Sequence, residues 1–189
     1  KVYGGFKFYD RKEIKDFISY LRMAVNPFDN DAILRNINNP ARGIGDTTVN
    51  KLKAYAEANS MNLFSALSEI DKSGLPSAAI SKLKGFYEIL SDLIQKSSEM
   101  VATAFSKYVL FKSGFLDVLS HGTDDDLNRL ENMKELVSSI EEFVKTNQGA
   151  SISEYLQSVS LLSDTDEMTD DNLVTVATIH AGKGPEFDN

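Results

Sequence analysis

The chain has 189 residues, of which 42% are hydrophobic and 25% charged, proportions typical of a globular protein with a buried core. No apolar run approaches the roughly 18 residues of a membrane-spanning helix, no signal peptide is visible, and the absence of cysteine excludes disulfides and thiolate metal sites. We therefore expect a cytoplasmic location and no membrane partner. Because Lys1 is followed directly by strand-like residues, we also expect that the chain is part of a longer one.

The net charge of −8 is unevenly distributed along the chain. Residues 1–60 contain ten basic and seven acidic residues, a net +3, whereas residues 61–189 contain ten basic and 21 acidic residues, a net −11. Such an asymmetry indicates that the basic end faces nucleic acid. The acidic half is better suited to binding a protein partner.

Helical periodicity of apolar residues begins after a short strand-like segment and a glycine turn over residues 2–9. Asp10 and Glu13 have the spacing of a capping box, which predicts a helix that ends before Pro27. A short helix is then expected over 31–38, followed by a helix over 47–58.

The same periodicity continues to residue 163. A long helix is expected after Pro76, with a buried stripe of Ile80, Leu83, Tyr87, Leu90 and Ile94, widened by Ala79, Phe86 and Leu93. Further helices are predicted over 99–111, after a Thr123 cap, and after a Ser151–Glu154 capping box. The β-branched run 173–179 predicts a strand. The fold class is therefore mainly α, an orthogonal helical bundle with short strand-like ends.

Candidate catalytic and metal sites are few. Asp124, Asp125 and Asp126 could form a metal cluster, but the dipole of the helix that they begin stabilises carboxylates without a metal, and we favour that explanation. His121 is expected in a loop. No Gly-x-x-x-x-Gly-Lys-[Ser/Thr] motif occurs, because Lys183 precedes a glycine. We therefore predict no catalytic residue, no metal site and no cofactor bound by this chain.

The stretch from residue 39 to residue 48 has the sequence Asn-Pro-Ala-Arg-Gly-Ile-Gly-Asp-Thr-Thr. Glycine permits positive φ and the close approach of another backbone, and Asp46 or Thr47 is expected to cap the following helix. Free N–H groups at a positive helix end favour a phosphate. The predicted DNA-binding residues are Arg42, Gly43, Ile44, Gly45, Asp46, Thr47, Thr48 and Lys51. The alternative is a helix cap that binds nothing.

Three collinear segments resemble superfamily 1A DNA helicases of the UvrD/PcrA/Rep type. Residues 178–187, Thr-Ile-His-Ala-Gly-Lys-Gly-Pro-Glu-Phe, are similar to motif V of that family, and residues 2–16 resemble the segment before its inserted 2B subdomain. Residues 37–48 match its glycine turn, which resembles the hairpin of helix-hairpin-helix modules. The resemblance implies a helical 2B subdomain over 10–163, remnants of the 2A motor domain at 1–9 and 173–189, and an acidic linker at 164–172.

This resemblance also implies a function. The chain would be a duplex-DNA-contacting regulatory subdomain of an ATP-dependent DNA helicase acting in repair or replication. Its motif V residues, which couple nucleotide and DNA in the family, would be Thr178, His180, Lys183, Gly184 and Glu186, although Pro185 stands where the family has leucine.

ATP and Mg²⁺ would be held by other domains of the parent, so we expect the isolated chain to be inactive as an ATPase. The expected partners are DNA, as a duplex or a single/double-strand junction, the 1A, 1B and 2A domains, and an accessory protein. The alternative function is a helical protein-interaction module that binds partners through its acidic half.

Overall fold

The computed structural model describes residues 6–166, with side chains from Phe8 to Leu161, and within these residues the backbone forms helices and no strand. In chain order the elements are α1 (Phe6–Tyr9), α2 (Lys12–Val25), α3 (Asn30–Asn36), α4 (Asp46–Ala58), α5 (Leu63–Ser68), the 3-10 helix η1 (Ile70–Ser73), α6 (Ser77–Glu99), α7 (Ala102–Lys112), α8 (Phe115–Ser120), α9 (Asp124–Thr146) and α10 (Ile152–Asp166). The predicted mainly α class is confirmed. None of the described helices has the length and hydropathy needed to cross a bilayer.

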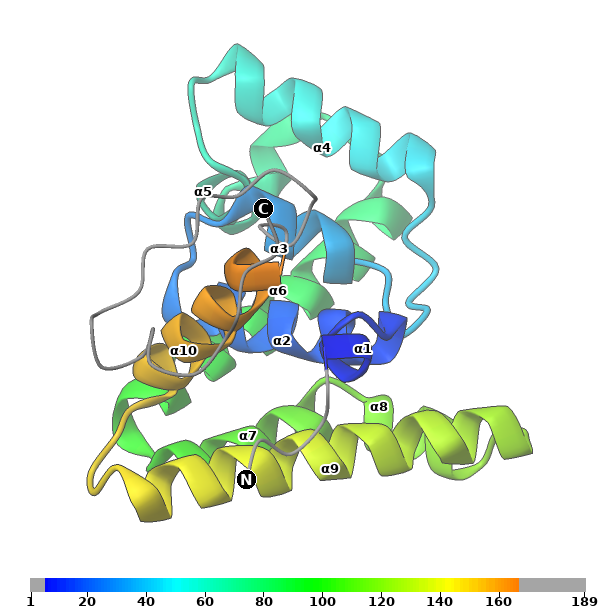
Figure 1. Cartoon of the computed structure of the whole chain (residues 1–189). Helices are drawn as coiled ribbons and strands as arrows, with labels where there is room; N and C mark the ends of the chain where they lie inside the picture. Colours follow the sequence, from blue (N-terminus) through cyan, green and yellow to red (C-terminus); the bar gives the residue numbers. More distant parts are fainter. Residues whose placement is uncertain (1–5, 167–189) are drawn as a thin grey trace, which may run out of the picture.

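Helix α2 lies at the centre of the molecule and packs against α3, α6, α9 and α10 (Figure 1). Most of its apolar residues, among them Ile14, Phe17 and Leu21, are fully buried because helices cover it on several sides. The buried carboxylate of Asp16 is neutralised by Arg35 Nε at 2.7 Å and Lys12 Nζ at 3.0 Å. Helices α7, α8 and α9 form one layer below α2, whereas α4 and α5 lie at the opposite end (Figure 1).

The start of α2 differs from the prediction. Residues 6–9 form a helical turn instead of a strand end, and Arg11, not Asp10, is the N-cap residue. Arg11 donates to Asn132 Oδ1 of α9 at 2.6 Å, and the Asn132 amide donates to Glu13 Oε1 at 2.7 Å. Asp10 pairs with Lys15 at 2.8 Å. Contacts with α9 therefore replace the predicted Asp10–Glu13 capping box.

The boundary between α6 and the next helix differs from the prediction, and the buried stripe of α6 is rotated. It extends to Glu99, so the next helix begins at Ala102 and not at residue 99. Its fully buried residues are Leu83, Phe86, Leu90 and Leu93, while Ile80, Tyr87 and Ile94 are only partly buried. The rotation follows from its neighbours, because α6 packs against α2, α5 and α7.

Two predicted helix caps are confirmed. The Thr123 side chain accepts from the Asp126 N–H, and the Asp126 carboxylate accepts from the Thr123 N–H at 3.0 Å. Hydrogen bonds from the Thr123 backbone and hydroxyl lower the pKa of Asp126. Ser151 and Glu154 form the equivalent box before α10. In residues 8–161 no three carboxylate or imidazole groups converge as a metal site.

One predicted boundary near the C-terminus, the start of the acidic linker, differs in the structure. Helix α10 continues to Asp166, so the first three residues of the predicted acidic linker, 164–166, are helical. The rest of that linker and the predicted motif V strand and turn, including Thr178, His180, Lys183, Gly184 and Glu186, lie outside the described residues.

Candidate nucleic-acid interface

The turn between α3 and α4 is fastened to the body of the protein by the residues at its base. The Asn38 side-chain oxygen accepts the N–H groups of Arg42 at 2.8 Å and Ile44 at 3.0 Å. The side chain of Ile44 is buried, with 1% of its surface exposed. Gly43 and Gly45, on either side of it, are exposed. The turn is thus anchored on one side and presents its backbone to solvent on the other.

The side chain of Arg42 points into the protein. Its two Nη atoms donate four hydrogen bonds, to Asn36 O at 3.1 Å, Pro40 O at 2.9 Å, Tyr20 Oη at 2.6 Å and Ser113 O at 2.6 Å. Its guanidinium also lies over the Tyr20 and Phe86 rings, 5.9 and 5.6 Å from their centroids. Arg42 was predicted to face DNA, but the structure places it where it ties the turn to α2 and to the corner between α7 and α8.

The two glycines of the turn have different roles. Gly43 has φ +70°, the left-handed region that favours glycine, and a Cβ on it would lie 2.9 Å from Lys82 Nζ. Gly45 has φ −80° and ψ 168°, an extended conformation open to any residue, and a Cβ on it would meet nothing within 4 Å. Only Gly43 is required by the protein's own geometry.

Gly45 is the N-cap residue of α4, and no side chain caps this helix end. The predicted cap by Asp46 or Thr47 is wrong, because both residues already belong to the first turn. In the described part of the chain, the N–H groups of Gly45, Asp46 and Thr47 donate no hydrogen bond. These donors stand at the positive end of the helix dipole, which favours an anion.

Two hydroxyl groups lie beside these donors. Thr47 is exposed and Thr48 is partly exposed, and neither hydroxyl has a hydrogen-bond partner in the part of the chain that the structure describes. The exposed carboxylate of Asp46 opposes an anion at the same place. An anionic ligand would therefore need hydrogen bonds from several donors at once to offset the repulsion by Asp46, and a phosphate group can accept several such bonds.

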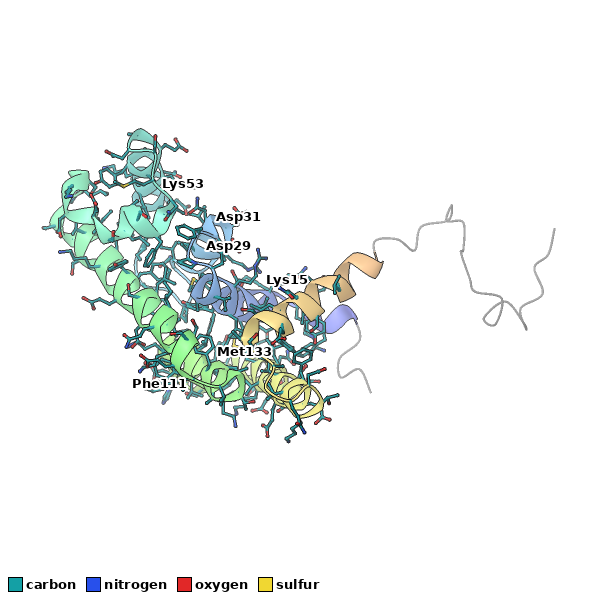
Figure 2. All side chains as sticks on the ribbon, turned by 90° about the vertical axis from the view of Figure 1, so that its left-hand side faces the viewer. Lys15, Asp29, Asp31, Lys53, Phe111 and Met133 are labelled. Atoms are coloured by element: carbon teal, nitrogen blue, oxygen red, sulfur yellow. The ribbon has the colours of Figure 1, made fainter. Side chains whose placement is uncertain are left out.

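The described lysines without a carboxylate partner lie on α4, which begins at this turn, and on α6, which contacts it through Lys82. Within residues 8–161, Lys51, Lys53 and Lys82 are exposed and form no ion pair, whereas every other lysine in that range does. Figure 2 shows Lys53 on α4, at the opposite end of the molecule from Phe111 and Met133. These ammonium groups are available to an anionic ligand, although the chain as a whole is acidic.

Sequence reasoning missed Lys82. It lies on α6, 39 residues from Gly43, yet its Nζ donates to the Gly43 carbonyl oxygen at 2.9 Å. No local pattern links the two residues, since only the packing of α6 under the turn brings them together. The only sequence feature that could have indicated Lys82 was a basic side chain on the polar face of a predicted helix.

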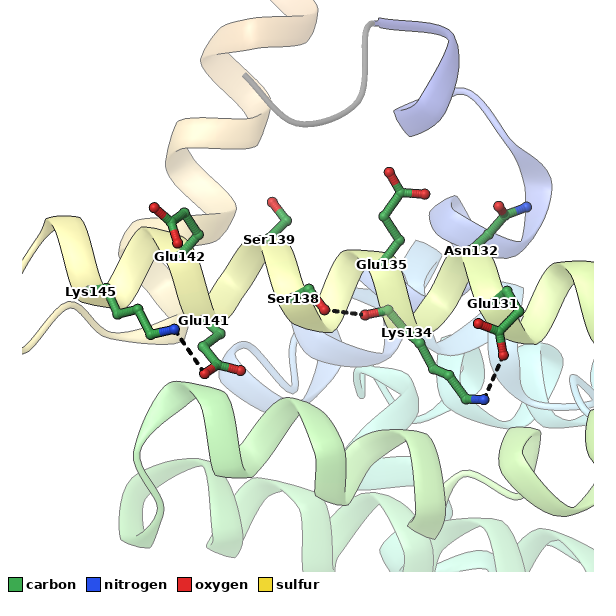
Figure 3. A pocket seen from close by; sticks show the side chains of 9 residues that line it. All are labelled: Glu131, Asn132, Lys134, Glu135, Ser138, Ser139, Glu141, Glu142 and Lys145. Carbon is green, nitrogen blue, oxygen red and sulfur yellow. Dashed lines mark hydrogen bonds and ion pairs between the residues drawn. The ribbon is translucent and has the colours of Figure 1, made fainter. Parts of the chain in front are cut away.

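A second candidate surface runs along α9, where a hollow of about 680 Å³ is lined by Glu131, Asn132, Lys134, Glu135, Ser138, Ser139, Glu141, Glu142 and Lys145 (Figure 3). Lys134 pairs with Glu131 at 2.6 Å, and Lys145 pairs with Glu141 at 3.1 Å. Among the described residues no cation pairs with the carboxylates of Glu135 and Glu142. The hollow is therefore acidic, which repels phosphate and suits a basic partner.

The whole chain, residues 1–189, matches the family of UvrD-like helicase C-terminal domains, and it therefore belongs to this family. Among its relatives are the ATP-dependent DNA helicases PcrA of Staphylococcus epidermidis and of Staphylococcus aureus, each 38% identical over 187 residues. The alignments cover 97% of this chain but 26% of each relative, so the chain spans about a quarter of their length. The predicted kinship with UvrD-type helicases is confirmed.

Proposed function

We propose that this chain is the 2B subdomain of an ATP-dependent DNA helicase that acts in repair or replication, and that it contacts the backbone of duplex DNA through residues 43–48 and Lys51. The relatives that it matches are named ATP-dependent DNA helicases, and it corresponds to a quarter of their length. The subdomain would regulate unwinding by holding the duplex ahead of the rest of the helicase, its 1A, 1B and 2A domains, and the helicase would act in the cytoplasm.

One observation carries this proposal: three N–H groups and two hydroxyls at the N-terminus of α4 have no partner among the described residues, and two exposed lysines, Lys51 on α4 and Lys82 beside Gly43, form no ion pair there. Such groups bind phosphates, which carry no direct sequence information. A turn of this size would neutralise two or three phosphates, so the logarithm of affinity should fall with the logarithm of salt with a slope of about −2 to −3. We expect a Kd in the non-specific range, about 10⁻⁴ to 10⁻⁶ M or weaker.

The residues of this chain do not fit ATP and Mg²⁺. The sequence lacks a phosphate-binding loop of the Gly-x-x-x-x-Gly-Lys-[Ser/Thr] type, and the described carboxylates do not cluster as ligands of a metal. Both groups would be held elsewhere in the parent protein, and the isolated chain would hydrolyse no ATP. The residues that would couple the nucleotide to DNA are Thr178, His180, Lys183, Gly184 and Glu186.

The proposal is tested by titrating forked, duplex and single-stranded DNA at low salt with the wild-type chain and with a Thr48→Ala/Lys51→Ala variant. We expect the variant to bind duplex several-fold more weakly, because it loses a hydroxyl donor and a free ammonium group. The matched control is Lys145→Ala/Thr146→Ala, which makes the same chemical changes on α9. An unchanged duplex affinity of the Thr48→Ala/Lys51→Ala variant would show that the turn is only a helix end.

The alternative, a protein-interaction module, is favoured by the hollow on α9. Its free carboxylates, those of Glu135 and Glu142, lie on a surface remote in sequence from the turn. In that case a basic accessory protein would bind, and Glu135→Gln/Glu142→Gln would weaken its binding while the affinity for duplex DNA stayed the same.

A further inference from the structure

Among the described residues, Lys82 is the cation that contacts the Gly43 carbonyl of the turn. Its ammonium group donates to the Gly43 carbonyl at 2.9 Å, and its side chain is exposed. No carboxylate of residues 8–161 forms an ion pair with it. On the same helix, Lys84 is also exposed but pairs with Asp71 at 2.7 Å. The positive charge of Lys82 is therefore uncompensated and faces the turn.

The conformation of Gly43 is matched to this lysine. A Cβ on Gly43 would lie 2.9 Å from Lys82 Nζ and 3.3 Å from its Cε, so the absence of a side chain makes room for the ammonium group. The left-handed φ of +70° also excludes most other residues. The glycine and the lysine thus form one structural unit, although 39 residues separate them.

We propose that Lys82 is the principal phosphate-binding cation of the turn, and that Arg42 acts instead as a positioning residue that holds the turn from inside. This inference rests on the proposed contact with duplex DNA and adds the residue that carries the charge. An ammonium group has three donors. One is used on the Gly43 carbonyl, and the remaining two are free for phosphate oxygens.

The hydrogen bond to Gly43 also removes an obstacle to anion binding. A carbonyl oxygen beside the free N–H groups of residues 45–47 would repel a phosphate, and the ammonium group neutralises that partial charge. The two Nη atoms of Arg42 already donate four hydrogen bonds to acceptors within the protein, so they could reach a phosphate only by breaking those bonds. The division of roles between the two residues follows from these contacts.

The test compares Lys82→Ala with Lys84→Ala on the same helix, using a short duplex DNA at several salt concentrations. We expect Lys82→Ala to lower the affinity at low salt about two- to five-fold, as for an exposed charge pair, and to reduce the magnitude of the salt slope by about one. Lys84→Ala removes the same charge and frees Asp71, yet it should leave the slope unchanged. Lys82→Arg should restore the slope, and the thermal midpoint of all three variants should stay near that of the wild type.

Equal effects of Lys82→Ala and Lys84→Ala would overturn the assignment of Lys82, because net charge alone would then explain them. If the Thr48→Ala/Lys51→Ala variant were still impaired in that case, the proposed contact of the turn with DNA would stand without Lys82. If the wild-type chain bound no duplex at low salt, both proposals would fall together.

Discussion

At the scale of single residues, the candidate site depends on the buried Tyr20 and the partly buried Arg42, neither of which is expected to contact the proposed ligand. The Tyr20 hydroxyl accepts from Arg42 Nη2 at 2.6 Å and donates to the Asn39 carbonyl at 2.7 Å. The tyrosine ring lies edge-on against Phe115, with ring centroids 5.4 Å apart. Through these bonds the middle of α2 fixes the chain on both sides of Pro40, which sets the position of the turn.

Burial raises the pKa of Tyr20 to about 12, although Arg42 partly opposes the shift. Below pH 10 the hydroxyl is protonated in both the folded and the unfolded chain, so its contribution to stability is complete. As the pH rises from 10 to 12, the unfolded chain releases this proton first, and the free energy of unfolding falls. Two pKa units correspond to a loss of about 3 kcal/mol.

We therefore predict that Tyr20→Phe has a flatter decline in stability between pH 10 and pH 12 than the wild-type chain. At neutral pH the variant should be less stable by about 1–3 kcal/mol, because the Arg42 guanidinium and the Asn39 carbonyl each lose a partner. Urea unfolding at a series of pH values measures both effects. Tyr108 and Tyr155, whose pKa values are also raised, titrate in both proteins and cancel in the comparison. Parallel pH profiles for the two proteins would contradict this role of Tyr20.

At the scale of elements, α4 is attached to the body by a narrow face. Its fully buried residues are Leu52 and Ala56, which pack toward α5 and η1, and most of the remaining helix is exposed. Its N-terminus is uncapped by a side chain at Gly45, where the backbone would accept any residue. A side chain that capped this end would stabilise α4 but would occupy the donors that a phosphate needs.

This conflict gives a second prediction. Gly45→Asp should raise the free energy of unfolding by a few tenths of a kcal/mol, because aspartate is a better N-cap than glycine. The same substitution should weaken binding to duplex DNA, because the carboxylate repels phosphate and occupies the N–H groups that a phosphate needs. The matched control is Val101→Asp, at the uncapped N-terminus of α7, where the side chain is 72% exposed. The control should gain stability without a comparable loss of affinity. Equal DNA affinities of the two variants would contradict the proposed contact at Gly45.

The elements also show what the sequence could reveal. The cap at Thr123 and the capping box at Ser151 were predicted correctly because each depends on residues only three positions apart in the chain. The Asp10–Glu13 box failed because Glu13 is bound by Asn132, 119 residues away. The glycine turn was recognised from its sequence. The inward direction of Arg42 and the contact of Lys82 with Gly43 depend on how α2, α6 and α7 pack, and no local sequence pattern encodes that packing.

At the scale of the whole molecule, the basic and the acidic parts of the sequence correspond to the two candidate surfaces. The N-terminal 60 residues carry a net +3 and contain the glycine turn and α4, whereas the following residues carry a net −11 and contain the acidic hollow of α9. Figure 1 shows α4 and α9 at opposite ends of the molecule. The turn is tied through Arg42 to the corner between α7 and α8, so a duplex that followed α4 away from the turn would avoid the carboxylates of α9, which reduces the electrostatic repulsion between DNA and protein.

The location of DNA contact is tested most directly by following the backbone amide signals of the ¹⁵N-labelled chain by nuclear magnetic resonance while a short duplex is added at low salt. We predict that the largest shifts occur at the amides of Gly45, Asp46, Thr47 and Thr48, with smaller changes at Gly43 and little change along α9. Shifts concentrated on α9, or an unchanged turn while the duplex binds elsewhere, would contradict this prediction.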